Sequence, residues 1–227
     1  MLRLNAIRNL GQGAAVVWML AAVFMTYEFF LNRKVFFITE GWWEYYALLI
    51  EHGSDPYVTD GLKITPLHAI LTRMLQSVWG SNMLILRDIF SFIHLAQIAI
   101  ILYWTRAFNS TLAAIFAVSL TTTLVIQGEA YISKDYHTTL ALFLSLLLIS
   151  TEKAWASGRH LWTFLNAALC ALLFLTKQNV GLFVTIAVLI MTLIGGQPRP
   201  RRKAVTHVST FILVYVSILG TSLFFWT

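Results

Sequence analysis

Charged residues are scarce in this chain of 227 residues. Asp, Glu, Lys and Arg make up 11% of it, and its mean hydropathy is +0.73. A soluble globular domain carries about 25% charged residues. The deficit excludes a soluble protein and indicates an integral membrane protein built from helices of ~20 apolar residues. The alternation of apolar and polar residues that is typical of a membrane β-barrel is also absent.

Cysteine is nearly missing as well. Cys170 is the only one and lies within an apolar run, which excludes an intrachain disulfide and a thiolate metal site and predicts a small core residue. The chain also lacks a Gly-rich phosphate loop and the H-E-x-x-H and G-x-S-x-G motifs. The sequence therefore gives no support to cytosolic nucleotide chemistry. Its net charge of +6 comes from basic residues scattered over loops, so it does not indicate nucleic-acid binding.

Apolar segments are what the chain has in abundance, since 58% of its residues are hydrophobic. They predict an all-α fold: a polytopic membrane protein in which residues 1–227 form a single membrane domain of about seven transmembrane helices. The predicted spans are residues 13–31, 84–104, 111–127, 138–151, 161–176, 180–195 and 205–225. Two polar segments separate spans: residues 32–83, the first extracytoplasmic loop, and residues 128–137, the second outer loop. The first span ends in Tyr27-Glu28-Phe29-Phe30 rather than in a small-x-small cleavage site, which predicts an uncleaved helix.

The distribution of charge predicts the orientation. Nine of the 16 Lys and Arg residues fall in one set of short segments with a single acid, Glu152. These nine are Arg3, Arg8, Arg106, Lys153, Arg159, Arg199, Arg201, Arg202 and Lys203. Under the positive-inside rule, these segments are cytoplasmic. The prediction is a protein of the bacterial inner (plasma) membrane with a cytoplasmic N-terminus and both polar loops on the extracytoplasmic side.

The polar stretch 39–80 carries two predicted interfacial helices. In a helix that begins at Glu40, the side chains of Glu40, Glu44 and Glu51 fall within ~40° of one another. The other side carries Trp42, Trp43, Tyr45, Tyr46, Leu49 and Ile50. This pattern is typical of a helix in a membrane interface, with a solvated acidic face above an anchoring face. Thr65 is predicted to cap the second helix, which has Pro66 at its first position. Its apolar stripe is Ile64, Leu67, Ile70, Leu71, Met74, Leu75 and Val78.

Acidic side chains on the outer face are the first candidates for chemistry. Glu40 follows Val35-Phe36-Phe37-Ile38, where partial desolvation would raise the pKa of its carboxyl group and make it a better proton acceptor near neutral pH. The alternative is a structural charge that the helix macrodipole favours. Asp135 with His137 suits a divalent cation or the orientation of an acceptor hydroxyl. The alternative there is a surface pair between Lys134 and Asp135.

Basic and polar side chains are the other candidates for chemistry on the outer face. Lys177 ends an apolar span on the outer side, where it either neutralises a phosphate oxygen or snorkels to the interface. Arg73 and Arg87 suit phosphate because a guanidinium fork matches its oxygens, and His68 lies on the polar side of the second short helix. Residues with no predicted catalytic role are His94 and Gln97, which are expected to bond to neighbouring helices, and His52, His160 and His207.

The order of these elements resembles the GT-C superfamily of membrane glycosyltransferases. The stretch T-E-G-W-W-E-Y-Y-A-L-L-I-E-H-G-S-D-P-Y-V-T-D (39–60) is similar to the family's acidic residue followed by Y-Y-A…G…P-Y-x-D. Also similar are Pro66-Leu67, Leu86-Arg87, Asp135 and L-T-K-Q-N (175–179). The resemblance covers residues 13–195. Its motifs are short and degenerate, so they indicate a superfamily and not a substrate.

The resemblance implies a hexosyl- or pentosyltransferase of the mannosyl or arabinosyl kind. Such an enzyme moves a sugar from a polyprenyl-phosphate donor to an acceptor hydroxyl on the extracytoplasmic face. The implied site residues are Glu40, Glu44 and Asp135 for catalysis, Lys177, Arg87 and Gln178 for the donor phosphate, and His137 and His68 for the acceptor or a metal. The family more often has Asp at the position of Glu40, so the general base is either Glu40 or Glu44. The only cofactor implied is a divalent cation, Mg²⁺ or Mn²⁺.

Members of the superfamily usually continue with more spans, so this chain is expected to be the N-terminal seven-span module. It would then be C-terminally incomplete, completed by a partner subunit that a split gene encodes, or a minimal enzyme. The expected partners are a polyprenyl-phosphate-linked sugar, membrane lipids and a glycan, lipid or protein acceptor, and no nucleic acid. Two alternatives remain open: a non-catalytic or partial module in a membrane complex, and a lipid-linked-sugar transporter or flippase. Against the transporter, ionisable residues gather at one face rather than at the bilayer midplane.

Overall fold

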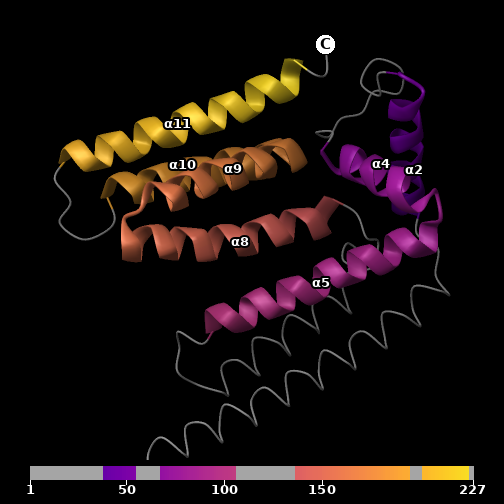
Figure 1. The fold of residues 1–227 in the computed structure, drawn as a ribbon, viewed down its shortest axis with the longest axis horizontal. Helices are drawn as coiled ribbons and strands as arrows, with labels where there is room; N and C mark the ends of the chain where they lie inside the picture. The colour runs from indigo at the N-terminus through magenta and orange to yellow at the C-terminus, as the bar shows by residue number, and fades with distance from the viewer. Residues whose placement is uncertain (1–37, 55–66, 106–135, 195–200, 225–227) are drawn as a thin grey trace, which may run out of the picture. The chain divides into compact units, whose positions relative to one another are not determined.

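The structure, a computed structural model, describes residues 38–54, 67–105, 136–194 and 201–224. Over these ranges it contains seven helices and no strand, which confirms the predicted all-α fold for this part of the chain (Figure 1). The helices are α2 (Ile38–Glu51), α4 (Leu67–Trp79), α5 (Met83–Thr105), α8 (Tyr136–Ser157), α9 (His160–Thr176), α10 (Gln178–Ile194) and α11 (Arg201–Phe224).

These residues form two compact units. The first unit contains 38–51, 71–105 and 136–138; the second contains 52–54, 67–70, 139–194 and 201–224. The division falls inside α4 and near the start of α8, so each of these helices contributes residues to both units.

Five of the predicted spans lie in the described residues, and each is a helix. The predicted first residues of α5, α9 and α10 and the predicted last residue of α9 lie within two residues of the observed ones. The prediction for α8 was too short, because this helix takes in the last two residues of the predicted loop 128–137 and continues to Ser157. Gly158, with φ +62°, then ends it, and its N–H donates to the carbonyl of Ala154 at 3.0 Å. The predicted spans 13–31 and 111–127 lie outside the described residues.

Two of the described helices are long and apolar enough to cross a membrane. They are α8, with 22 residues, and the part of α11 from Ala204 to Ser222. The helices α9 and α10 are apolar but have 17 residues each, and at 1.5 Å per residue each covers ~25 Å of a hydrocarbon core ~30 Å thick. These lengths indicate membrane association.

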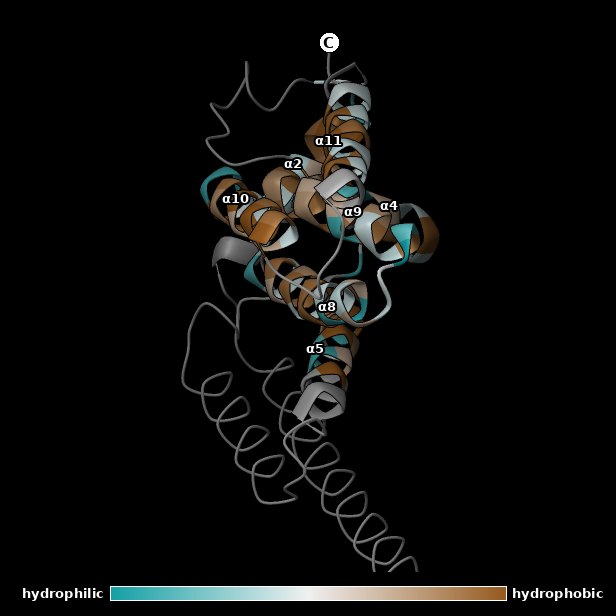
Figure 2. Cartoon of the chain, turned by 90° about the vertical axis from the view of Figure 1, so that its left-hand side faces the viewer, coloured by the Kyte–Doolittle hydropathy of each residue, from teal (hydrophilic) through white to brown (hydrophobic). Residues whose placement is uncertain are grey.

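Large apolar side chains of the second unit point outward. Phe183 is 71% exposed, Leu213 is 70% exposed and Ile194 is 81% exposed, and Figure 2 shows the hydrophobic residues of these helices in brown. The buried side chains include polar ones, among them Asn166 and His207. Apolar surface of this extent is unfavourable in water but not in lipid, where polar side chains join helices together.

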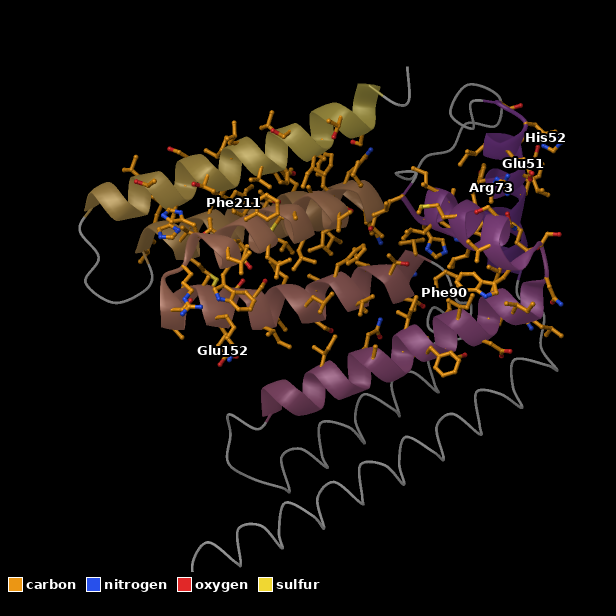
Figure 3. All side chains as sticks on the ribbon, in the orientation of Figure 1. Glu51, His52, Arg73, Phe90, Glu152 and Phe211 are labelled. Carbon is orange, nitrogen blue, oxygen red and sulfur yellow. The ribbon has the colours of Figure 1, made fainter. Side chains whose placement is uncertain are left out.

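The core of the second unit lies among α8, α9, α10 and α11. It consists of Leu147, Ala167, Leu169, Cys170, Leu173, Val188 and Phe211, and Figure 3 shows Phe211 between α11 and the α9–α10 pair. The prediction that Cys170 is a small core residue is confirmed, because its side chain is fully buried.

Polar contacts join the helices of the same unit. Ser150 on α8 donates to the amide oxygen of Asn166 on α9. Thr163 on α9 lies 2.7 Å from Nδ1 of His207 on α11, and the ring of His160 stacks on that of His207 with centroids 4.1 Å apart. The sequence analysis gave no role to these two histidines, and the structure makes His207 a buried contact between α9 and α11.

Candidate functional site

The first unit has a polar interior built by α2, α4, α5 and the first turn of α8. Arg73 on α4 pairs with Glu51 on α2 at 2.9 Å, and both lie at the end of α2 in Figure 3. The ring of Trp43 packs edge-on against that of Tyr136, with centroids 5.8 Å apart. These contacts tie α2 to α4 on one side and to α8 on the other.

The helix α5 contributes a stripe of buried polar side chains: Arg87, Ser91, His94 and Gln97. Spacings of three and four residues place all of them on one face. His94 Nε2 lies 3.1 Å from the Thr138 hydroxyl, and Gln97 Nε2 donates to the Thr138 carbonyl at 2.6 Å. The prediction that His94 and Gln97 bond to a neighbouring helix is therefore confirmed.

The helix α4 buries three polar side chains and exposes two residues of its apolar stripe. His68, Thr72 and Gln76, four residues apart, are each at least 95% buried, whereas Met74 is 59% exposed and Val78 is 68% exposed. A surface helix of a water-soluble domain does the reverse. The apolar stripe predicted from the sequence is present, but over Met74 and Val78 it faces away from the protein, as expected for a helix that contacts lipid.

Glu44 on α2 faces this polar interior. Its Oε1 atom is buried and has no hydrogen-bond partner among the residues described. Desolvation by burial raises the pKa of the Glu44 carboxyl group above its ordinary value, and the nearby charge of Arg87 partly lowers it. The prediction of a solvated acidic face therefore holds only in part for Glu44, whose side chain is half-exposed but has one buried carboxylate oxygen. It holds for Glu51, which is exposed and paired with Arg73. Beside Glu44, the α2 residues Trp43 and Ala47 are buried, whereas Glu51 at the end of the helix is exposed.

Gln76 on α4 is the second buried group without a partner. Its side chain is 5% exposed, and neither Nε2 nor Oε1 has a hydrogen-bond partner in the described part of the chain. Buried polar atoms are rarely left unsatisfied, and each exception requires an explanation. The sequence analysis missed this residue. The sequence feature that could have identified it is the four-residue spacing of His68, Thr72 and Gln76, which places these polar residues on one helix face.

The remaining predicted site residues are placed as follows. Glu40 lies in the first turn of α2, but its side chain is outside the described part of the structure, as is all of Asp135. His137 is half-buried in the first turn of α8, and its ring lies 4.0 Å from that of Tyr136. His68 is buried, and its Nδ1 lies 3.0 Å from the Thr139 hydroxyl.

Lys177 is the single residue between α9 and α10. Its backbone is extended, and its N–H donates to the Leu173 carbonyl at 2.8 Å. Lys177 is half-buried, and Gln178, the first residue of α10, is exposed. Of the predicted residues, the first unit brings together Glu44 and Arg87; His68, Lys177 and Gln178 belong to the second unit.

The raised pKa of Glu44 predicts a pH-dependent stability difference. Because the folded protein binds this proton more tightly than the unfolded chain, the contribution of Glu44 to stability is present below the pKa of a free glutamate, ~4.3, and is lost as the pH rises through the folded value. Relative to the wild type, Glu44→Gln should be unchanged near pH 4 and gain about 0.5–1 kcal/mol at pH 7, less than the full penalty of an orphan group because solvent screens a half-exposed carboxylate. Unfolding in detergent at several pH values measures this difference. A variant less stable than the wild type at pH 7 would contradict it.

The described residues contain no group of three or more His, Cys, Asp or Glu side chains that could hold a metal ion. Asp135, on which the predicted cation site depends, lies outside these residues, so the divalent cation stays a prediction. The chain was also compared with known proteins. No protein-family model, no curated protein and no solved structure matches it.

Proposed function

We propose that this protein is an integral membrane glycosyltransferase that moves a sugar from a polyprenyl-phosphate donor to an acceptor hydroxyl, with Glu44 as the general base. One observation carries the proposal: a carboxylate oxygen of Glu44 is buried without a hydrogen-bond partner in the described polar interior. A buried carboxylate oxygen with a purely structural role is usually hydrogen-bonded. A carboxylate that must accept a proton from a substrate is instead left open, with a raised pKa.

In the proposed reaction, ionised Glu44 accepts the proton of the acceptor hydroxyl. The hydroxyl oxygen forms a bond to the anomeric carbon of the sugar, and the bond from that carbon to the donor phosphate oxygen breaks. The electron pair leaves with the phosphate. Arg87 is buried and its charge acts on Glu44, so it is placed to limit the rise in the pKa of Glu44 and keep part of the carboxylate ionised. The roles of Lys177 and Gln178 toward the donor phosphate rest on the family resemblance and stay predictions.

The proposed setting is the inner (plasma) membrane, with seven spans, a cytoplasmic N-terminus and the reaction on the extracytoplasmic face. Supporting it are the two helices that are long enough to span a bilayer and the outward-facing apolar side chains of α4, α10 and α11. A substrate with a polyprenyl tail reaches such a protein from the membrane, and the sugar-phosphate head lies at the interface.

Sugar transfer by the purified full chain in nanodiscs tests the proposed function. The chain is supplied with polyprenyl-phosphate esters of several hexoses and pentoses, with and without Mg²⁺ or Mn²⁺, and with membrane extract as the source of acceptor. We expect release of polyprenyl phosphate from at least one donor at a rate above that of empty nanodiscs. No release from any donor would contradict the proposal.

The proposed topology predicts which residues can be labelled from each side of the membrane. In a Cys170→Ala background, a membrane-impermeant maleimide should label Gln178→Cys in intact cells and should label Ser157→Cys only after permeabilisation. Both native side chains are exposed, so neither new thiol is hidden by packing. Labelling of Ser157→Cys in intact cells would indicate that the protein has the opposite orientation in the membrane. Labelling of Gln178→Cys from both sides would favour the transporter alternative.

A further inference from the structure

Gln76 differs from Gln97, the other buried amide among the described residues of the first unit. Gln97 donates to the Thr138 carbonyl at 2.6 Å, so the first unit satisfies an amide that holds helices together. Gln76 is equally buried, at 5% exposure, yet both ends of its amide lack a partner among the described residues. Its neighbour one turn earlier, Arg73, is tied to Glu51, so α4 is held against α2 without any contribution from the Gln76 side chain.

The chemistry of a primary amide narrows the ligand that would satisfy it. The NH₂ group offers two donors and the carbonyl oxygen accepts. A phosphate or carboxylate would satisfy only the NH₂ end, and a cation would satisfy only the oxygen. Two adjacent hydroxyl groups satisfy both ends, since one accepts from Nε2 while the other donates to Oε1.

A second unsatisfied atom in the same unit points to the same kind of ligand. Oε1 of Glu44 lacks a partner as well, and as a carboxylate oxygen it accepts a hydrogen bond from a hydroxyl. The helices α2 and α4 that carry Glu44 and Gln76 are joined by the Glu51–Arg73 pair. Each of these unmet groups is therefore suited to a hydroxyl group of a ligand.

We propose that Gln76 binds two adjacent hydroxyl groups of the sugar on which the enzyme acts. The inference rests on the proposed function for the identity of the ligand as a sugar. The hydroxyl pair belongs either to the sugar of the lipid-phosphate donor or to a glycan acceptor, and Gln76 then sets which sugars are bound.

The first part of the test measures whether the Gln76 amide contributes to the stability of the folded protein, as a structural amide would. Gln76→Leu and the matched control Gln97→Leu are purified as full chains, and their unfolding temperatures in detergent are compared with that of the wild type. Gln76→Leu is expected to unfold at or above the wild-type temperature, because it removes a buried polar group that bonds to nothing. Gln97→Leu is expected to unfold at a lower temperature, because it breaks a buried hydrogen bond. A fall for Gln76→Leu as large as that for Gln97→Leu would overturn the assignment.

The second part measures sugar recognition without turnover. Methyl mannopyranoside, methyl glucopyranoside, methyl arabinofuranoside and their mono-deoxy analogues are titrated into the wild type and Gln76→Leu in nanodiscs, and so are farnesyl-phosphate esters of the same sugars. We expect the wild type to bind at least one parent sugar about 10-fold more tightly than its deoxy analogue, and Gln76→Leu to reduce this ratio to within about 2-fold. If Gln76→Leu proves too unstable to titrate, Gln76→Asn, which withdraws the amide by one methylene, should reduce the ratio in the same direction.

The outcomes show whether the hydroxyl groups belong to the donor or to the acceptor. They also test the inference about Gln76 separately from the proposed glycosyltransferase function. Discrimination among free methyl glycosides assigns the pair to an acceptor, and discrimination among farnesyl-phosphate esters alone assigns it to the donor. Equal ratios in the two proteins, or no sugar bound by the wild type, would overturn the inference and indicate that water satisfies Gln76. Discrimination that depends on Gln76 in a protein that transfers no sugar would leave the inference standing and reject the proposed glycosyltransferase.

Discussion

Replacing Glu44 by glutamine is expected to slow sugar transfer by about 10²–10⁴-fold, the usual contribution of a general base. Glutamine keeps the size of the side chain but does not accept a proton from the acceptor hydroxyl. Because the carboxylate oxygen Oε1 has no hydrogen-bond partner among the described residues, the substitution breaks no hydrogen bond at this atom, although it removes the attraction between the Glu44 carboxylate and Arg87. The rate of polyprenyl phosphate release by the variant and by the wild type, at saturating donor, measures the effect.

Two control variants identify which carboxylate acts. Glu51→Gln lies on the same helix but is exposed and paired with Arg73, so it should retain the rate to within a few fold. Glu40→Gln tests the other carboxylate that the family resemblance implies. A Glu44→Gln enzyme that keeps the wild-type rate to within about 3-fold would reject Glu44 as the base, and loss of activity in Glu40→Gln alone would transfer the role to Glu40.

The dependence of the transfer rate on pH tests the same assignment of Glu44 as the general base. A general base acts only when ionised, and burial raises the pKa of Glu44. The acidic limb of the rate profile should therefore lie above the ~4.3 of a free glutamate. Because the folded protein binds this proton more tightly than the unfolded chain does, ionising the proposed base costs some stability.

Much of the fold follows from the sequence because apolar segment length and turn residues determine helix positions. The link between α9 and α10 is a case in point, since the polar run Lys177-Gln178-Asn179 interrupts two apolar runs and the structure breaks the helix at Lys177 alone. The sequence does not determine in the same way which side of α4 is buried. Periodicity shows which side is apolar, but whether that side is buried depends on whether water or lipid surrounds the helix.

The candidate site was predicted only in part, and the reason lies in tertiary packing. On a helical wheel Glu44 and Glu51 share one face, yet a carboxylate oxygen of Glu44 is buried and Glu51 is exposed. Burial of Arg87 and Gln76 is likewise set by packing among helices that are distant in the sequence. A polar stripe at spacings of three and four residues, as in α5, is the sequence signal that identifies such an interior.

Substituting Gly181 by alanine is expected to destabilise the second unit by about 3 kcal/mol or more, the largest effect on stability that we predict. A Cβ atom at Gly181 would overlap the backbone Cα and N of Phe174 on the adjoining helix α9. Neither helix can move away easily, because Lys177 alone connects them and the Phe174 ring packs edge-on against Tyr215 of α11. Unfolding by SDS titration of the chain in mixed micelles measures the change.

Gly220→Ala is the matched control for this substitution. Gly220 also lies within a helix, α11, but a Cβ atom there would have nothing within 4 Å. Alanine should therefore raise helix stability by about 0.5–1 kcal/mol through the lower conformational entropy of the unfolded chain. If Gly181→Ala unfolded within 1 kcal/mol of the wild type, α9 and α10 would be able to separate. The position of Lys177, which the close approach of these two helices fixes, would then also be adjustable.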